Sequence, residues 1–527
     1  MQARVPVTFS PAGVTVWVRP GTTVDAAAKA AHVLVPTPCA GRGVCAGCGV
    51  RVIAGELEVP DEVERRSLRR APEGVRLACR ARVAGPVEVR PLFSAPVSGV
   101  AAVAEGASER ASTVSLVAGV DLGTTSVAVL IAEAASGREI GRASVANQQA
   151  SFGADVLSRV SAALSGQAAE LRALAEDSVC DALQAAAAAG GVDLSRVARV
   201  QVAANSAMAA LLVGADVSTL AAHPFASPVG GDPLPRDSRV RVALAPDAEV
   251  ALIPPIAAFV GGDALAATVA AGLVDVAAPT LLVDLGTNAE IVLAQPDGLW
   301  VASTAAGPAF EGAGVSCGGP AIIGAVDRVD ISAGAVLLHA IGDAEPRWFS
   351  GAGLVSAAAQ LVAVGHIAPD GAMVPEGPLA ARFARDEAGV LCVRLSQEGA
   401  PSVVLTQLDV RALQLAKAAV RMGIETLLRH AGLSADSLAE VLVAGAFGAA
   451  LAPNDLVAIG VLPSNARGRI RQVGNAALEG AAAMALDRGV ASLADRAAER
   501  AVHVDLAADA GFNAGFVSAT EFVAYEA

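Results

Sequence analysis

Apolar and polar residues alternate in two short segments near the N-terminus, at 5–9 and 14–18, with Pro-Ala-Gly between them at 11–13. Alternation with a period of two around a turn predicts a β-hairpin. Apolar positions spaced for one helix face follow at 23–31, where a threonine can cap the first turn. Further alternation at 50–52 and 87–89 indicates later strands. We therefore expect a small mixed domain over 1–92.

A segment without clear periodicity separates this domain from the rest of the chain. Residues 93–115 are rich in Ala, Ser, Gly and Val, which is typical of a connector. Strongly apolar strands resume directly after it. An internal repeat divides this larger part, and we expect a first lobe at 116–278 and a second lobe at 279–527.

The repeat consists of two strand–turn–strand segments that carry the same short motif. The first turn reads Asp121-Leu-Gly-Thr-Thr125, and the second reads Asp284-Leu-Gly-Thr-Asn288. One such motif is short and turn-like, but two copies between apolar strands indicate a duplication. The turn offers backbone N–H groups and hydroxyls to phosphate, and its carboxylate suits Mg²⁺. The pattern predicts one phosphate-binding cleft shared by both lobes.

A third motif follows a long amphipathic helix that begins near Thr406, where Thr406 and Asp409 can form a capping box. The apolar strand after this helix ends in a glycine turn at 445–448. Small residues there allow an adenine ring to lie against bare backbone. The residues predicted to bind nucleotide or phosphate are Asp121, Gly123, Thr124, Thr125, Asp284, Gly286, Thr287, Asn288, Gly307, Gly445 and Gly448.

Composition narrows the class of protein. The 527 residues are 54% hydrophobic, which excludes a disordered chain and leaves room for about three domains. The most apolar stretch, 251–274, is interrupted by Pro, Gly and Asp, so no membrane span is predicted. The N-terminus lacks the basic start and apolar block of a signal peptide. We expect a soluble cytoplasmic protein.

Charge excludes two further classes. The first 92 residues carry 13 basic and 8 acidic side chains, whereas the remainder carries 25 and 44. A large acidic body with few aromatic residues argues against nucleic-acid binding. The only two lysines, Lys29 and Lys417, lie outside any Gly-x-x-x-x-Gly-Lys-Ser/Thr pattern, which excludes a P-loop.

Four cysteines in the basic module form the pattern C-x5-C-x2-C-x30-C, at Cys39, Cys45, Cys48 and Cys79. The neighbouring glycines allow backbone N–H groups to approach an anionic centre such as inorganic sulfide. Structural zinc usually takes two Cys-x2-Cys pairs, and only one is present. The spacing favours a [2Fe–2S] cluster, with a zinc site and plain core cysteines as the alternatives.

These motifs resemble known families. The cysteine module resembles plant-type ferredoxins, and the three later motifs resemble the superfamily of acetate kinase, sugar kinases, heat-shock chaperones and actin. Together they resemble the ATP-dependent reductive activators of corrinoid proteins, with markers at 119–127, 153–160, 281–293, 303–314 and 444–448. This resemblance implies an α/β multidomain protein. A β-grasp [2Fe–2S] ferredoxin-like domain would precede a duplicated RNase-H-like ATPase fold.

The resemblance also implies an activity. One electron would pass from the cluster to Co(II) cobalamin, regenerating Co(I) for methyl transfer, with ATP and Mg²⁺ as further cofactors. Asp121 and Asp284 would face Mg²⁺, and Asp263 or Glu290 would orient the water that hydrolyses ATP. The expected partners are the corrinoid protein of a methyltransferase system and an upstream reductase or ferredoxin. A homodimer is compatible with the sequence.

Three other activities remain open at this point. ATP-gated electron donation could serve a different metalloenzyme of the radical dehydratase type, although such activators usually carry their cysteines inside the ATPase body. A small-molecule kinase with a redox domain would phosphorylate an acceptor. A non-catalytic electron-transfer scaffold would bind nucleotide without turnover.

Overall fold

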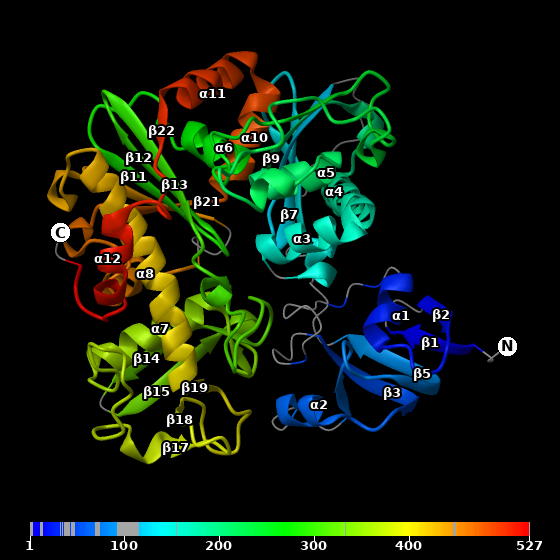
Figure 1. The fold of residues 1–527 in the computed structure, drawn as a ribbon, viewed down its shortest axis with the longest axis vertical. Helices are drawn as coiled ribbons and strands as arrows, with labels where there is room; N and C mark the ends of the chain where they lie inside the picture. Colours follow the sequence, from blue (N-terminus) through cyan, green and yellow to red (C-terminus); the bar gives the residue numbers. More distant parts are fainter. Residues whose placement is uncertain are drawn as a thin grey trace.

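The computed structural model describes residues 4–10, 14–31, 33, 35, 43, 48–68, 74–91, 115–153, 155–332, 334–445 and 450–525. The predicted connector at 93–115 lies outside the described residues except for Ser115, as do Cys39, Cys45 and Gly448. Figure 1 shows a small N-terminal domain beside two larger lobes.

The N-terminal domain is built on a five-stranded sheet of order β2-β1-β5-β3-β4. Its strands are β1 (Val5–Phe9), β2 (Val14–Val18), β3 (Gly49–Leu57), β4 (Val75–Leu77) and β5 (Val83–Pro91), and its helices are α1 (Val24–Ala30) and α2 (Glu62–Ser67). The predicted hairpin is the antiparallel pair β1–β2, and β1 also pairs in parallel with β5. Thr23 caps α1 by accepting a hydrogen bond from the Ala26 N–H, so the predicted helix start is confirmed.

The first lobe contains a five-stranded sheet of order β10-β9-β6-β7-β8. Its strands are β6 (Leu116–Leu122), β7 (Ser126–Glu133), β8 (Glu139–Ala146), β9 (Val197–Ala204) and β10 (Glu249–Leu252). Its helices are α3 (Val156–Ala162), α4 (Ala168–Gly190), α5 (Ser206–Val213) and α6 (Gly262–Ala270). The central strand β6 is buried along nearly its whole length, as expected for a strand covered on both faces.

The second lobe contains a six-stranded sheet of order β21-β20-β11-β12-β13-β22 and two three-stranded sheets, β15-β14-β16 and β17-β18-β19. The strands of the large sheet are β11 (Thr280–Leu285), β12 (Ala289–Gln295), β13 (Gly298–Thr304), β20 (Glu440–Ala444), β21 (Ile470–Gly474) and β22 (Ala501–His503). The small sheets comprise β14 (Ala325–Ser332), β15 (Ala335–Ala340), β16 (Trp348–Phe349), β17 (Phe383–Arg385), β18 (Leu391–Arg394) and β19 (Val404–Thr406). The helices are α7 (Gly351–Ala363), α8 (Gln407–His430), α9 (Pro453–Ala458), α10 (Ala476–Leu486), α11 (Arg488–Arg500) and α12 (Ala510–Ala519).

The two large sheets share one topology. In each, three consecutive antiparallel strands form a meander, β6-β7-β8 in the first lobe and β11-β12-β13 in the second. In each, the first meander strand also pairs in parallel with a later strand: β6 pairs with β9, and β11 pairs with β20. The repeat seen in the sequence motifs is therefore a repeat of five sheet strands, to which the second lobe adds β22.

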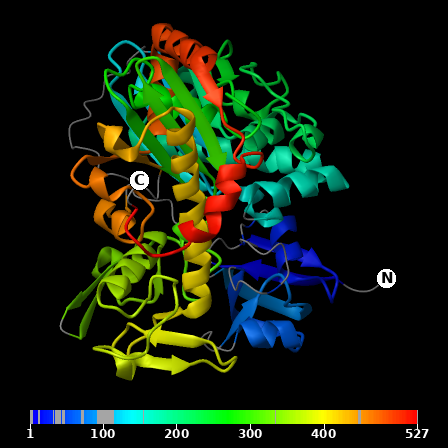
Figure 2. The ribbon, with the colours of Figure 1, turned by 60° about the vertical axis from the view of Figure 1, so that its left-hand side comes forward.

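Helix α8 begins as the capping pattern predicts. The Thr406 hydroxyl accepts a hydrogen bond from the Asp409 N–H, and the Asp409 carboxylate accepts one from the Thr406 N–H. Figure 2 shows this helix, in yellow, running beside the C-terminal segment and down toward the small sheets. No helix in the described part of the chain is both long and apolar enough to cross a bilayer.

Helix α10 joins the lobes, because it follows β21 of the second lobe but packs on β6, β9 and α6 of the first. Glycines make this packing close. A Cβ at Gly119 would lie 2.4 Å from the Ala482 nitrogen, and one at Gly480 would lie 2.0 Å from the Ala266 oxygen. The lobes therefore meet through backbone-to-backbone contact at α6 and α10, which lie side by side in Figure 1.

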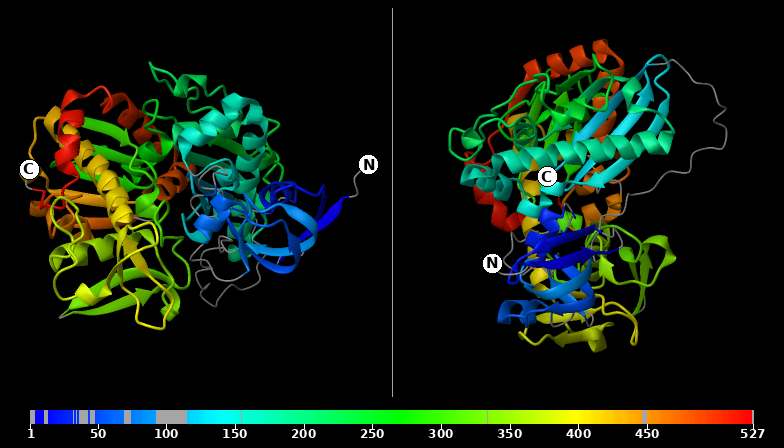
Figure 3. Two further views of the ribbon diagram at one scale, coloured as in Figure 1. Left: turned by 60° about the horizontal axis from the view of Figure 1, so that its bottom comes forward. Right: turned by 90° about the vertical axis from the view of Figure 1, so that its right-hand side faces the viewer.

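The N-terminal domain lies below the first lobe, with α1 close to α3 (Figures 1 and 3). The Lys29 ammonium nitrogen lies 5.0 Å from the centroid of the Phe152 ring, in a cation–π contact between these two parts. Phe152 ends the 3-10 helix η1 (Gln148–Phe152), which leads directly into the segment before α3. One side chain of the N-terminal domain thus contacts the first lobe beside its helical layer.

Candidate functional site

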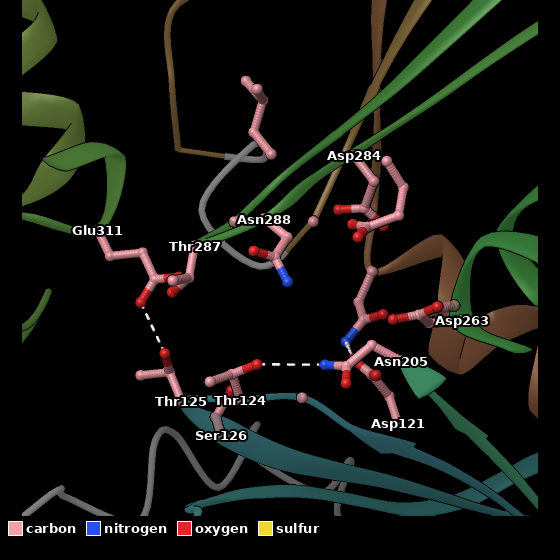
Figure 4. Close-up of a pocket in the computed structure, with 17 residues that line it drawn as sticks. Asp121, Thr124, Thr125, Ser126, Asn205, Asp263, Asp284, Thr287, Asn288 and Glu311 are labelled. Atoms are coloured by element: carbon pink, nitrogen blue, oxygen red, sulfur yellow. Dashed lines mark hydrogen bonds between the residues drawn. The ribbon is translucent and has the colours of Figure 1, made fainter. Parts of the chain in front are cut away.

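The two repeated turns face each other across one cleft between the lobes (Figure 4). The first turn joins β6 to β7, and the second joins β11 to β12. The cleft has a volume of about 650 Å³, part of it open to solvent. Its lining residues are Asp121, Gly123, Thr124, Thr125, Ser126, Asn205, Asp263, Asp284, Leu285, Gly286, Thr287, Asn288, Glu290, Glu311, Gly445, Asn475 and Ala477.

This cleft brings together the residues predicted to bind nucleotide or to act on water, apart from Gly307 and Gly448. Gly448 lies outside the described residues. Gly307 lies behind the second turn, where its N–H donates a 2.9 Å hydrogen bond to the Thr287 carbonyl. Residues that are distant along the chain therefore converge on one site.

Three polar side chains hold the first turn, Asn147 and Arg159 from behind it and Asn205 from the cleft. Asn147 Nδ2 donates to the Gly123 carbonyl at 2.8 Å, and Arg159 donates to the Thr124 carbonyl at 2.5 Å. Asn205 Nδ2 donates to the Thr124 hydroxyl at 3.2 Å. Burial lowers the pKa of Arg159 to about 10, so its guanidinium is still charged at neutral pH. A fixed positive charge thus lies directly behind a turn suited to phosphate.

Four carboxyl groups gather at the inner end of the cleft. Burial raises the pKa of Asp121 to about 6, and burial with the charge of Asp121 raises that of Asp263 to about 7. Burial, followed by the charges of Asp121 and Asp263, raises the pKa of Asp284 to about 8. Burial and the charges of Asp263 and Asp284 also raise the pKa of Glu290. These groups resist ionising together, and a cation among them would favour their charged forms.

The donor set suits Mg²⁺ that arrives with a phosphate ligand. Within the described residues, no three His, Cys, Asp or Glu side chains form a group that could hold a metal ion. Mg²⁺ usually takes one or two carboxylates and fills its other positions with phosphate and water. Asp121 and Asp284, one from each turn, provide that number of carboxylates.

Asn475 is a cleft residue that the sequence motifs did not reveal. Its Nδ2 donates to an Asp121 oxygen at 2.7 Å, and its Oδ1 accepts from the Leu478 N–H at the start of α10. The capping position could be recognised as an asparagine before an alanine-rich helix. The contact with Asp121 could not, because the two residues are 354 positions apart.

Gly445 lies where β20 meets the second turn. Its φ is +95°, and a Cβ there would lie 2.5 Å from an Asp284 carboxylate oxygen and 2.8 Å from the Leu285 carbonyl oxygen. Only glycine fits this position without displacing the turn. The start of the predicted adenosine motif therefore lies directly against the phosphate turn.

In the N-terminal domain, the sulfur atoms of Cys48 and Cys79 lie 3.2 Å apart. Cys48 is buried just before β3, and Cys79 follows β4, so the pairing of these strands brings the two together. Cys39 and Cys45, the other predicted ligands, lie outside the described residues. Two thiols this close suit shared coordination of an iron centre.

The fold and the two sites define a protein in which an iron–sulfur domain is joined to a duplicated ATPase-type fold. Residues 7–84 match the model of a 2Fe-2S iron-sulfur cluster binding domain. Residues 116–275 match the RACo middle region, and residues 278–527 match the C-terminal domain of RACo, the ASKHA domain. ASKHA denotes the superfamily of acetate kinase, sugar kinases, heat-shock chaperones and actin. Both the ferredoxin-like domain and the ASKHA fold predicted from the sequence are therefore confirmed.

Similar proteins specify the family. The chain is 30% identical over 413 residues to the corrinoid activation enzyme RamQ of Eubacterium limosum, covering 76% of this chain and 69% of that protein. It is 28% identical over 328 residues to the [Co(II) methylated amine-specific corrinoid protein] reductase of Methanosarcina barkeri, covering 56% and 57%. A solved structure of a reductive activator for corrinoid, iron-sulfur protein has a TM-score of 0.71 and 24% identity, covering 98% of both chains. The chain belongs to the family of reductive activators of corrinoid proteins, as its motifs predicted.

Proposed function

We propose that this chain uses ATP to activate a corrinoid protein of a methyltransferase system. One electron passes from its iron–sulfur domain to Co(II) of the partner's corrinoid, which becomes Co(I), while the domain is oxidised by one electron. An upstream reductase or ferredoxin returns that electron. The corrinoid activation enzyme and the reductase among its relatives support this choice of partner.

The cysteines support the electron-transfer part of the proposal. A [2Fe–2S] cluster supplies one-electron transfer when it is bound. Its four ligands would be Cys39, Cys45, Cys48 and Cys79. Cys48 and Cys79 already lie with their sulfurs 3.2 Å apart, and the burial of Cys48 limits access of water to that side.

The observation that carries the ATP part is that both halves of a duplicated sheet present the same Asp-x-Gly-x-Thr turn to one cleft. In our proposal the backbone N–H groups of both turns bind the phosphates, together with the hydroxyls of Thr124, Thr125 and Thr287. Asp121 and Asp284, one from each turn, would hold Mg²⁺, which would offset the phosphate charge. The adenosine lies toward the glycine turn that begins at Gly445.

ATP is needed because reduction of the cobalt is uphill. A plant-type [2Fe–2S] centre has a potential near about −400 mV, and each further 59 mV or so of deficit lowers a one-electron equilibrium about tenfold. ATP changes this balance only if it favours one conformation over another. Two lobes that meet at α6 and α10 can supply such a two-state element by closing on the phosphates.

The base for ATP hydrolysis is Asp263 or Glu290 in our proposal. Asp263 lies in the first turn of α6, where its Oδ1 accepts a 2.8 Å hydrogen bond from the Ala264 N–H. Glu290 lies on β12 and accepts a hydrogen bond from the Ser303 hydroxyl at 3.3 Å. A base must be ionised, and a neighbouring cation would favour that form of either group by lowering its raised pKa. Asp263→Asn and Glu290→Gln, compared for ATP turnover at equal nucleotide binding, identify which group acts.

The test of the proposed function is anaerobic reduction of a corrinoid protein, followed by the absorbance of Co(I) with and without ATP. We expect a higher Co(I) yield with ATP. Cys48→Ser should abolish reduction in both conditions, whereas Cys180→Ser, on α4 of the first lobe, should not. Equal Co(I) yields with and without ATP would contradict the ATP coupling.

A further inference from the structure

One carboxylate joins the two turns of the cleft. Glu311 ends the 3-10 turn η6 (Pro308–Glu311) of the second lobe. Its Oε2 accepts a hydrogen bond from the Thr125 hydroxyl at 2.7 Å, and its Oε1 accepts one from the Thr287 hydroxyl at 2.6 Å. Figure 4 shows Glu311 beside Thr287, with its bond reaching across to Thr125. The two donors come from different lobes.

These two hydroxyls are donors that the proposed function assigns to phosphate. A hydroxyl has one proton and donates it to one acceptor at a time. While Glu311 accepts both protons, neither is free for another anion. A carboxylate resembles a phosphate here, since each offers two oxygens and negative charge to the same donors.

We propose that Glu311 takes the place of a phosphate group in the ligand-free cleft and is displaced when a nucleoside triphosphate binds. This inference rests on the proposed nucleotide site. The phosphate oxygens accept the protons of Thr125 and Thr287, and like charge drives the carboxylate away. Glu311 is thus a positioning residue that makes the cleft selective for ligands with enough phosphate charge to displace it.

The turn that carries Glu311 packs closely against the start of helix α7. A Cβ at Gly312 would lie 2.9 Å from the Gly351 nitrogen, and one at Gly351 would lie 1.7 Å from the Phe310 oxygen. The turn that carries Glu311 is therefore packed backbone to backbone against the first residues of α7. Movement of this turn toward the helix would therefore press directly on its first residues.

The test compares nucleotide affinities of the full chain by titration calorimetry, with a non-hydrolysable ATP analogue, AMPPNP, and with adenosine. In Glu311→Gln the amide retains one acceptor oxygen and no negative charge. We expect this variant to bind AMPPNP about tenfold more tightly than the wild type, because the competing anion is gone. Adenosine, which has no phosphate, should bind both proteins equally. Glu398→Gln, at an exposed glutamate of the same lobe, removes the same charge and should bind like the wild type.

Unchanged or weaker AMPPNP binding by Glu311→Gln, with normal adenosine binding, would overturn the inference. So would lost ATP turnover at unchanged affinity, which would make Glu311 a catalytic base. If Glu311→Gln also loses adenosine binding, the variant has damaged the site, and Glu311→Asp becomes the test. Its shorter carboxylate cannot reach both hydroxyls, so this variant should also bind AMPPNP more tightly than the wild type. Wild-type protein that binds no AMPPNP would instead overturn the proposed nucleotide site itself.

Discussion

At the scale of single residues, the acidic side chains of the cleft lower the stability of the ligand-free protein and at the same time suit it to bind a cation with its ligand. Asp121, Asp263, Asp284 and Glu290 share one buried space, where the charges of Asp121, Asp263 and Asp284 raise the pKa of neighbouring acids. Four acids in such a space cost folding free energy unless they are protonated or neutralised by a cation. Residues that destabilise the ligand-free protein are expected where a ligand supplies the missing charge.

Asp284 provides a direct test of this cost. Its folded pKa is about 8 against an ordinary 3.8, so between about pH 4 and pH 8 the folded protein holds a proton that the unfolded chain has lost. Stability therefore falls as pH rises through this window. Asn cannot titrate. The free energy of unfolding of Asp284→Asn should therefore exceed that of the wild type by more than about 1 kcal/mol near pH 8, and by little near pH 4. Urea unfolding without nucleotide or Mg²⁺ measures this, and parallel pH curves would contradict it.

Gly445 tests how closely the adenosine motif meets the phosphate turn. In Gly445→Ala the new methyl group would meet Asp284 at 2.5 Å and displace the second turn. We expect at least about a tenfold loss of AMPPNP affinity, with the circular dichroism spectrum of the wild type. Gly468→Ala is the matched control, since φ is +87° there but nothing lies within 4 Å of the added Cβ. AMPPNP affinity in Gly445→Ala as high as in Gly468→Ala would contradict the expected clash with Asp284.

Sequence alone predicted the residues of this site that belong to short motifs. Both turns were found because their residue types and spacing recur within a few positions. The contacts that hold these turns were not predicted: Glu311 meets Thr125 across 186 positions, and Arg159 meets Thr124 across 35. Contacts set by tertiary packing leave no local pattern to recognise.

At the scale of elements, α10 is the part of the fold that the sequence did not anticipate. Its alanines and glycine predict a packed helix but give no information about the lobe on which it packs. The structure places it against α6 and β6, with Asn475 at its N-terminus bonded to Asp121. Any movement of α10 away from α6 would therefore also move Asn475 relative to Asp121 in the cleft.

Gly480→Val should separate these two helices. A Cβ at Gly480 would lie 2.0 Å from the Ala266 oxygen, and backbone cannot yield as a flexible side chain would. We expect AMPPNP affinity to fall at least about tenfold, because α10 would carry Asn475 away from Asp121. Ala483→Val introduces the same β-branched side chain at a half-buried position of the same helix and should retain binding. Full affinity in Gly480→Val would show that closure does not depend on this contact.

At the scale of the whole molecule, a series of contacts connects the iron–sulfur domain to the cleft. Lys29 lies over the Phe152 ring, and the carbonyl of the next residue, Gly153, accepts a 3.1 Å hydrogen bond from Arg159 Nε. Arg159 also donates to the Thr124 carbonyl in the first turn. The motifs predicted which domains are present but not this placement, because the composition of a connector holds no information about where its ends dock.

The two lysines of the chain allow this connection to be tested in the intact protein. Lys417 is fully buried in α8, where it donates to the carbonyls of Ala519 and Glu521, so an amine reagent applied to the folded protein reaches Lys29 as its lysine target. If phosphate binding shifts the first turn, AMPPNP with Mg²⁺ should change the labelling rate of Lys29 at least about twofold, as followed by mass spectrometry. Arg159→Met, which removes the link from Gly153 to Thr124, should make that rate independent of nucleotide. The labelling rate of the wild type could stay unchanged although calorimetry confirms that AMPPNP binds. Lobe closure would then influence electron transfer through the partner protein rather than through this contact.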